Sequence, residues 1–317
     1  MRKSVFFLAV SAMFFLSSCK EDIPSRFEEG PYTVTTLQKG MFDIEDSNSS
    51  NPAGVHEGGM NNCSNMYLVL GKKKALLIDL SNDIKWADNA AESLRKVFYD
   101  LAGKREKIIT ITHVHGDHTG MLHAFVDDPE VSFFLPKKDF EGDKRFPEDR
   151  TDIIDDGFVF DLGGVKVDAI DVQGHTPGSM AFYVEGQDAL FSGDAVGSGS
   201  GVWIFSLDGF KQFEKGLANL ITFLENPANG VNLDKLTVYG AHAWQKGQKP
   251  KLDMPFIYDL QGAVDDIEAA KAVWEPYRTG MPMLNANFKH GEGTITWSTD
   301  SYAKLCAEKG IEVALTE

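Results

Sequence analysis

Four potential metal ligands fall within six residues of this chain, at His113, His115, Asp117 and His118. They follow the apolar run 108–111, which has the length and composition of a buried strand. Imidazole and carboxylate groups are good zinc ligands, and burying so many ionisable groups without a cation would be costly. The pattern therefore indicates a metal site at the end of a strand. Histidines satisfied within a polar loop are the alternative interpretation.

Two further histidines occupy similar positions. His175 and His242 each follow a strand-like run, so five of the eight histidines lie in the cluster or at these two positions. Side chains at the ends of neighbouring strands are well placed to meet at one edge of a sheet. We therefore expect the five imidazoles to converge in the folded protein.

The apolar periodicity predicts two blocks of strands with helices between and after them. Strands are expected at residues 32–44, 66–70, 75–80, 108–111, 158–162, 165–172, 180–184, 189–191 and 236–239. Helix-period stripes cover residues 86–101, 210–224 and 257–274, and such stripes mark the face that a surface helix buries. The length of 317 residues and the hydrophobic fraction of 43% suit a single globular domain. Two sheets with outer helices are the expected result.

Four separated motifs carry a resemblance to a known family. They are Thr-His-Val-His-Gly-Asp-His-Thr-Gly at 112–120, Gly-His-Thr-Pro-Gly-Ser at 174–179, Ser-Gly-Asp at 192–194 and Tyr-Gly-Ala-His at 239–242. The residues of these motifs, their order along the chain and their spacing resemble those of the metallo-β-lactamase superfamily. The resemblance implies an α/β fold, a four-layer αββα sandwich of two mixed β-sheets with outer helices.

The resemblance also implies a ligand set for two metal ions. One metal would be held by His113, His115 and His175, and the other by Asp117, His118 and His242, with Asp194 bridging both. The last motif departs slightly from the family, because Ala241 and Ala243 flank His242 where many members have glycine. Zinc is the expected metal, and manganese or iron can occupy similar sites.

A paired metal site of this kind implies hydrolysis. Two metal ions share a water, lower its pKa towards neutrality and present the resulting hydroxide to a carbonyl or phosphorus centre. We expect Asp117 to accept a proton in addition to its ligand role. Asp79 resembles the family's supporting aspartate, which orients a ligand histidine from behind; a helix or turn cap beside Ser81 is its alternative role.

Other candidate residues match no motif. His56 lies in the Gly-rich segment 46–59, which is expected to be a loop, and we interpret it as a solvated histidine. His123 and His290 are interpreted as structural or surface residues. Trp203 and Phe205 follow closely after Asp194, the expected bridging residue. For both aromatic side chains, contact with a substrate and packing in the core are equally good interpretations.

The net charge of −16 disfavours nucleic acid as a partner, because phosphate binding needs clustered Lys and Arg. The aspartate at the bridging position resembles thioesterases, lactonases and phosphodiesterases more than β-lactamases, which usually carry Cys or Ser there. The expected activity is hydrolysis of a lactone, ester or phosphoester in a small extracellular molecule. A β-lactam hydrolase is the second hypothesis, and a non-catalytic, metal-dependent binding lipoprotein is the third.

Residues 1–18 have the pattern of a signal peptide, with a charged start and an apolar stretch, 5–16, that is too short to span a membrane. The sequence Leu-Ser-Ser-Cys at 16–19 resembles the lipobox of bacterial lipoproteins, which implies a lipid on Cys19. A plain secretory signal with an incidental cysteine is the alternative. The expected location is the outer membrane, on the periplasmic face or at the cell surface.

The rest of the chain divides simply. Residues 19–30 are polar and are expected to form a tether, and residues 31–317 are expected to form the hydrolase domain. The two cysteines beyond the anchor, Cys63 and Cys306, are predicted either to pair in an oxidising compartment or to remain buried thiols. The pattern leaves the oligomeric state open.

Overall fold

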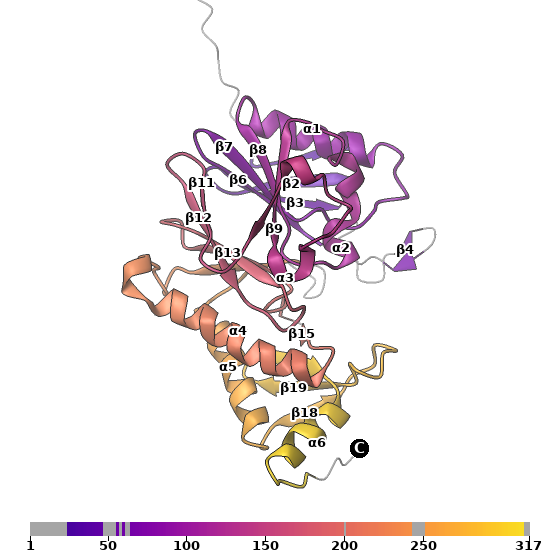
Figure 1. The fold of residues 1–317 in the computed structure, drawn as a ribbon, viewed down its shortest axis with the longest axis vertical. Helices are drawn as coiled ribbons and strands as arrows, with labels where there is room; N and C mark the ends of the chain where they lie inside the picture. Colours follow the sequence, from indigo (N-terminus) through magenta and orange to yellow (C-terminus); the bar gives the residue numbers. More distant parts are fainter. Residues whose placement is uncertain are drawn as a thin grey trace, which may run out of the picture.

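The computed structural model describes residues 24–46, 55–56, 59–60, 64–199, 201–242 and 251–313. Two large mixed sheets lie face to face with helices on their outer faces (Figure 1). This arrangement is the predicted αββα sandwich. The predicted signal peptide and Cys19 lie outside the described residues.

The first sheet has eight strands, antiparallel at one end and parallel at the other. In spatial order they are β1 (Arg26–Glu29), β2 (Tyr32–Gln38), β3 (Met41–Asp46), β6 (Met66–Leu70), β7 (Lys74–Ile78), β8 (Glu106–Thr110), β9 (Val131–Pro136) and β10 (Thr151–Ile154). The second sheet contains β11 (Val159–Asp161), β12 (Lys166–Asp171), β13 (Met180–Val184), β14 (Ala189–Gly193), β16 (Thr237–Gly240) and β17 (Lys251–Leu252).

Two smaller sheets and the helices complete the structure. The smaller sheets are β15 (Val202–Trp203), β20 (Gly293–Trp297), β19 (Ala286–His290) and β18 (Val273–Pro276), and the pair β4 (Val55–His56) and β5 (Gly59–Met60). The α-helices are α1 (Ala90–Ala102), α2 (Gly116–Thr119), α3 (Lys137–Phe140), α4 (Leu207–Glu225), α5 (Met254–Glu268) and α6 (Thr299–Glu308). The short 3-10 helices are η1 (Gly120–Ala124), η2 (Glu148–Arg150) and η3 (Pro227–Asn229).

The core consists of three apolar clusters, one for each interface between neighbouring layers. Strand side chains alternate between two faces, so in β7 the side chain of Leu77 packs beneath α1 while Leu76 faces the second sheet. The outer face of the second sheet, including Leu190, packs against α4 and α5. Because these strands are buried on both faces, their sequences read as continuous apolar runs.

The four-stranded sheet is a feature that the sequence did not predict. It packs against α5, and its strand β20 pairs in parallel with β15, with Val202 opposite Ile295. Figure 1 shows this orange and yellow C-terminal part below the indigo and magenta sheet. Trp274 was expected on the helical stripe 257–274, but it lies on β18 because α5 ends at Glu268 and the backbone then turns at Ala270, where φ is +56°.

Three other expectations near the N-terminus need correction. The expected strand 32–44 is a hairpin of β2 and β3, which turns at Gly40 with φ +78°. Part of the expected tether forms β1, which pairs with β2 because Phe27 supplies an apolar side chain that packs against the core. The segment 46–59, expected as a loop, contains the short strand β4 and the first residue of β5.

No helix among the described residues is both long enough and apolar enough to cross a bilayer.

Candidate metal centre

The site lies where several strands end. His113 to His118 follow β8, His175 follows β12, Asp194 follows β14 directly, and His242 follows β16. β8 belongs to the first sheet and the other three strands to the second. The strand ends of both sheets thus bring together residues that are more than a hundred positions apart in sequence.

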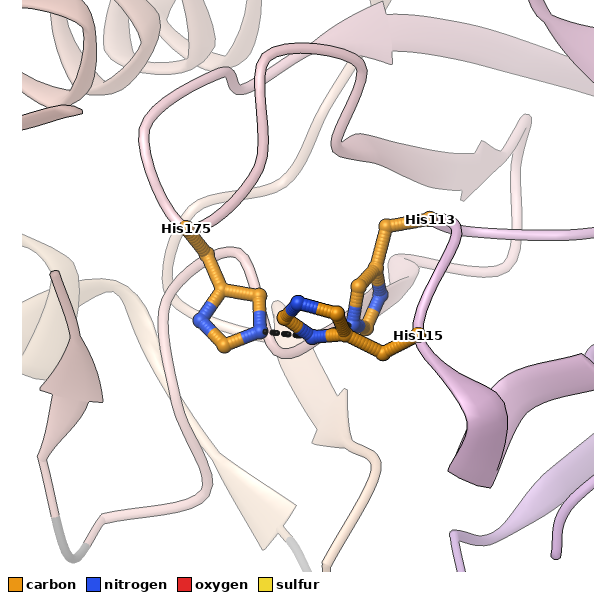
Figure 2. Close-up of side chains that lie close together, drawn as sticks. All are labelled: His113, His115 and His175. Atoms are coloured by element: carbon orange, nitrogen blue, oxygen red, sulfur yellow. Dashed lines mark hydrogen bonds between the residues drawn. The ribbon is translucent and has the colours of Figure 1, made fainter. Parts of the chain in front are cut away.

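Three imidazoles form the first group of donor atoms, and Figure 2 shows their rings pointing toward one another. The Nδ1 atom of His115 lies 3.0 Å from Nε2 of His113 and 3.0 Å from Nε2 of His175. His113 is fully buried and His175 is 6% exposed. These three nitrogen atoms lie within 4.8 Å of one another and form a group able to hold a metal ion.

The second group consists of two carboxylates and two imidazoles. Nε2 of His242 lies 3.1 Å from Asp194 Oδ1 and 3.5 Å from Asp117 Oδ2, and Nε2 of His118 lies 3.7 Å from Asp194 Oδ1. The other carboxylate oxygen of Asp194, Oδ2, is 3.6 Å from Nε2 of His175 in the first group. Asp194 therefore lies between the two groups.

Hydrogen bonds behind the rings set their orientation. The Nδ1 atom of His175 bonds to the backbone oxygen of Trp203 at 2.8 Å, and Nδ1 of His118 bonds to Asp79 Oδ2 at 2.8 Å. Because both acceptors lack a proton, each Nδ1 donates, and each Nε2 then presents a lone pair to the site.

Asp79 has the orienting role that its resemblance implied. It is 1% exposed, its φ is +67°, and besides His118 it accepts hydrogen bonds from the amide and the hydroxyl of Thr112, at 2.7 and 2.9 Å. The Thr112 hydroxyl also lies 3.1 Å from Nδ1 of His113. Asp79 thus supports one histidine directly and a second through Thr112.

Burial keeps the first group of histidines neutral. It lowers the pKa of His113 well below its usual value and the pKa of His175 to about 4, and the neighbouring imidazoles lower the pKa of His113 further. Burial also lowers the pKa of His115. Neutral imidazoles carry the free lone pairs that metal coordination requires.

In the second group, the carboxylates and the imidazoles shift one another's pKa. Burial lowers the pKa of His118, but Asp79, Asp194 and Asp117 outweigh it, so that this pKa is raised well above its usual value. Burial raises the pKa of Asp194, but the two histidines of this group lower it well below its usual value. Without a metal, a proton on an imidazole balances the carboxylates, and a cation can take the place of that proton.

Two observations show that the residues suit a divalent cation. Nε2 of His118 is buried and has no hydrogen-bond partner, which is costly for a polar atom. The three nitrogens of the first group, moreover, cannot all satisfy one another, because a neutral imidazole has a single N–H. Tetrahedral zinc with bonds of about 2.0 to 2.1 Å places its nitrogen ligands about 3.3 Å apart, close to the observed spacing.

A cavity of about 320 Å³ opens beside the donor atoms. The donor residues that line it are His115, Asp117, His175, Asp194 and His242, and Trp203, Phe205 and Met281 contribute apolar side chains. Val202 and Ile204, which alternate with them along the chain, are fully buried in the core. Trp203 and Phe205 therefore face the cavity, where a substrate could contact them, and are not packed in the core.

The remaining histidines and the cysteines lie apart from the donor groups. His123 is exposed and bonds to the Gly120 oxygen, and His290 pairs with Asp266 at 2.7 Å, so both are surface residues as predicted. His56 is on β4, and its side chain is outside the described part. Cys306 is a free, buried thiol on α6, which is one of the two predicted alternatives, whereas Cys63 lies outside the described residues.

Sequence reasoning missed Asp139 on α3. Its Oδ2 accepts hydrogen bonds from the Val114 amide at 3.0 Å and the Thr176 hydroxyl at 2.6 Å, and its Oδ1 accepts one from the Gly178 amide at 2.8 Å. Asp139 therefore joins the loop of His113 and His115 to the loop of His175. No local motif marks it, because its partners are distant in sequence.

Comparison of sequences gives a family match. The sequence model of the metallo-beta-lactamase superfamily matches residues 63–247. An atrochrysone carboxyl ACP thioesterase of Claviceps purpurea is 29% identical over 181 residues, which cover 56% of this chain and 50% of the relative. A beta-lactamase-like protein 2 homolog of Caenorhabditis elegans is 28% identical over 176 residues, which cover 55% and 58%. The chain thus spans about half the length of these curated relatives.

Solved structures show the same fold at low sequence identity. A metallo-beta-lactamase from Erythrobacter litoralis has a TM-score of 0.54 and 13% identity, covering 76% of this chain and 99% of its own. A metallo-beta-lactamase from Pontibacter korlensis has a TM-score of 0.52 and 17% identity, covering 74% and 99%. At these identities the likeness shows the fold alone, and each comparison covers about three quarters of this chain.

Proposed function

Since the superfamily model matches more than half of it, this chain belongs to the metallo-beta-lactamase superfamily, and we propose that it is a binuclear metal-dependent hydrolase of ester-like bonds in a small extracellular molecule. The observation that carries the proposal is the pair of adjacent donor groups. One group holds three imidazole nitrogens, and the other combines two imidazoles with two carboxylates.

Two zinc ions are the proposed occupants, with manganese or iron as the alternatives. His113, His115 and His175 would hold one ion, Asp117, His118 and His242 the other, and Asp194 both. The position of Asp194, within 3.7 Å of histidines from both groups, supports the bridging role. When bound, such a pair supplies a water of lowered pKa as the nucleophile and polarises the oxygen that gains charge.

The residues of the chain supply geometry and proton transfer. Asp117 lines the cavity with one carboxylate oxygen 3.5 Å from His242 Nε2, so it is placed to accept a proton during attack on the substrate. The hydrogen bonds that His118 donates to Asp79 and His175 donates to the Trp203 oxygen fix these two rings before substrate binds. Rigid placement of this kind is the main contribution of a protein to metal-assisted hydrolysis.

The proposed bond is a lactone, a carboxylic ester, a thioester or a phosphoester. Thioesters are included because the matched protein of Claviceps purpurea is named a thioesterase. Because the residue at the proposed bridging position is an aspartate, a β-lactam is only the second candidate substrate.

A substrate screen tests this proposal. Purified protein loaded with zinc would be assayed against lactones, esters, thioesters, phosphodiesters and β-lactams, with and without a chelator. Hydrolysis that requires metal is the expected result for at least one ester-like class. Turnover of β-lactams alone would replace the proposal with the β-lactamase hypothesis, and no turnover with full metal occupancy would favour a binding lipoprotein.

Replacing the proposed bridging residue gives a sharper test. Asp194→Ala is expected to lower the metal content from two ions to one or none and to reduce kcat by about a hundredfold or more, because both ions lose a ligand. Metal content would be measured by elemental analysis. His123→Ala is the matched control, since His123 is exposed and apart from both donor groups. Wild-type metal content and rate in Asp194→Ala would contradict bridging.

We also propose that a lipid on Cys19 anchors the protein to the outer membrane, facing the periplasm or the cell surface. The lipobox-like sequence at 16–19 supports this location. Labelling of the expressed chain with palmitate, lost in Cys19→Ser, is the expected result. Unlabelled, freely released protein would point to a plain secretory signal.

A further inference from the structure

The cavity has an apolar and aromatic wall beside the donor atoms. Phe205 packs against the proposed ligands, with ring centroids 5.7 Å from His115 and 5.4 Å from His175. Trp203 lies next to it, at 6.5 Å between centroids, and its backbone oxygen holds His175. The apolar wall therefore begins beside the atoms at which a bond would be cleaved.

Met281 extends this wall from a distant part of the chain. It lies on the connection between β18 and β19, it is 37% exposed, and it lines the same cavity. The connection is ordered by hydrogen bonds of the Thr279 hydroxyl to the backbone of Met281 and Leu284. Residue 281 lies outside the segment 63–247 that matches the superfamily model, so this contribution belongs to the C-terminal part of this chain.

The charges in the cavity limit what this wall can bind. Among the described residues that line it there is no Lys or Arg, and its carboxylates, Asp117 and Asp194, are both proposed metal ligands. Among these described residues, an acidic group at the far end of a substrate would find no cationic side chain to compensate for its lost hydration. A volume of about 320 Å³ is at the lower end of the range of ligand pockets, which suits a short apolar group.

We propose that Trp203, Phe205 and Met281 form an acyl subsite, which selects esters or thioesters whose acyl group is uncharged and aliphatic or aromatic. The subsite rests on the proposed hydrolase function. Phe205 contacts the acyl carbons nearest the scissile bond, and Met281 contacts the carbons farther out. Met281 is thus a specificity-determining residue supplied by the hairpin of the C-terminal sheet.

A series of 4-nitrophenyl esters from acetate to octanoate tests the subsite on the zinc-loaded full chain. The value of kcat/KM is expected to rise about two- to fourfold for each added methylene until the subsite is full. Met281→Ala is expected to flatten the rise for the longer esters. Met283→Ala is the matched control, because Met283 is 41% exposed on the same connection but does not line the cavity.

A charge reversal at the same position gives a second measurement. An ester of a dicarboxylic acid with one free carboxylate should be hydrolysed at least tenfold more slowly than the neutral ester of equal length. Met281→Lys is expected to recover much of this difference, and Met283→Lys is not. Binding of unreactive alkyl amides, measured by calorimetry, should show the same dependence on chain length.

The outcomes separate this inference from the proposed function. If no substrate of the screen is hydrolysed although alkyl amides bind with an affinity that increases with chain length, the hydrolase proposal fails and the subsite stands. If acetate is hydrolysed but neither rates nor amide binding depend on chain length, the subsite is wrong. Equal effects of the Met281 and Met283 variants would also overturn it.

Discussion

Asp79 shows how one buried carboxylate can organise several side chains of a site. It accepts three hydrogen bonds, two from Thr112 and one from His118, and it does so from a backbone conformation with positive φ at the end of β7. Because His118 is fully buried, its ring has no water that could replace this partner. The orientation of Nε2 therefore depends on Asp79.

Asp79→Asn is expected to weaken metal binding about ten- to a hundredfold, because the amide keeps the volume but loses the charge that holds Nδ1–H of His118. Competition with a chromophoric chelator would measure the affinity of each ion. The effect should appear mainly at the group that contains His118 and Asp117. Asp127→Asn, at an exposed position, is the control. Equal metal affinities in the two variants would show that Asp79 does not orient a metal ligand.

A second residue-scale prediction concerns Asp139, which bonds to the Val114 amide, the Thr176 hydroxyl and the Gly178 amide. Asp139→Ala leaves three donors without their partner, at a cost of about 1 to 3 kcal/mol for each donor that stays buried. We expect a lower melting temperature and weaker zinc binding at the histidines of the first group. Asp139→Asn, which retains one acceptor oxygen, should recover part of both losses.

The control for Asp139 lies on the same helix, α3. Lys137 is exposed and pairs with Asp155 at 3.7 Å. Lys137→Ala should leave zinc affinity unchanged. A melting temperature that falls in Asp139→Ala while zinc affinity stays at the wild-type value would show that Asp139 stabilises the fold without positioning the ligands.

The sequence identified the residues that converge at this site but not all of the residues that support them. The seven proposed ligands lie in short motifs after apolar runs, which is a local pattern. Asp139 and the Trp203 carbonyl act across sequence distances of 25 to 39 and of 28 residues, respectively. Such contacts arise only when the sheets pack, so spacing along the chain does not reveal them.

At the scale of elements, prediction succeeded where a strand or helix has a strong apolar pattern. The hairpin of β6 and β7 and the helix α4 lie where the pattern placed them. Strand β18 is mostly exposed, with Val273 at 74%, so no apolar run marks it. The turn at Gly40 was missed because the start of β2 and all of β3 are buried, and the two strands together read as one long strand.

The link between α1 and the start of β9 provides an element-scale prediction. Asp128 accepts hydrogen bonds from the Tyr99 hydroxyl and the Glu130 amide and pairs with Arg95 at 2.8 Å. Burial raises the pKa of Asp128, but these three partners outweigh burial and lower it below its usual value. The folded state therefore binds this proton less readily than the unfolded state does.

The stabilisation by Asp128 should consequently be complete above the ordinary carboxyl pKa of about 4 and lost as the pH falls through the lowered value. We expect Asp128→Asn to lower the free energy of unfolding by about 1 to 2 kcal/mol at pH 7. The difference from the wild type should shrink below pH 4. Urea titrations at several pH values would measure it, and a difference independent of pH would contradict the role of the charge.

At the scale of the whole molecule, the C-terminal sheet and the second large sheet share one core. Trp297 of β20 is fully buried and stacks on Phe210 of α4, with ring centroids 4.6 Å apart. Its Nε1 donates a hydrogen bond to the Ser206 oxygen at 3.1 Å. Ser206 caps α4 and directly follows Phe205 of the cavity wall. The C-terminal part is therefore packed as an integral layer of the fold.

Because they share this core, the C-terminal sheet and the second large sheet with its metal centre are predicted to unfold together. Trp297→Ala should lower the free energy of unfolding by about 3 to 5 kcal/mol, the usual cost of removing a buried aromatic side chain. Release of bound zinc, followed with a chromophoric chelator, and loss of near-UV circular dichroism should then shift to the same lower temperature. Trp86→Ala is the matched control, because Trp86 is 37% exposed. An early transition of the variant that leaves zinc bound would instead show that the C-terminal sheet unfolds independently of the metal centre.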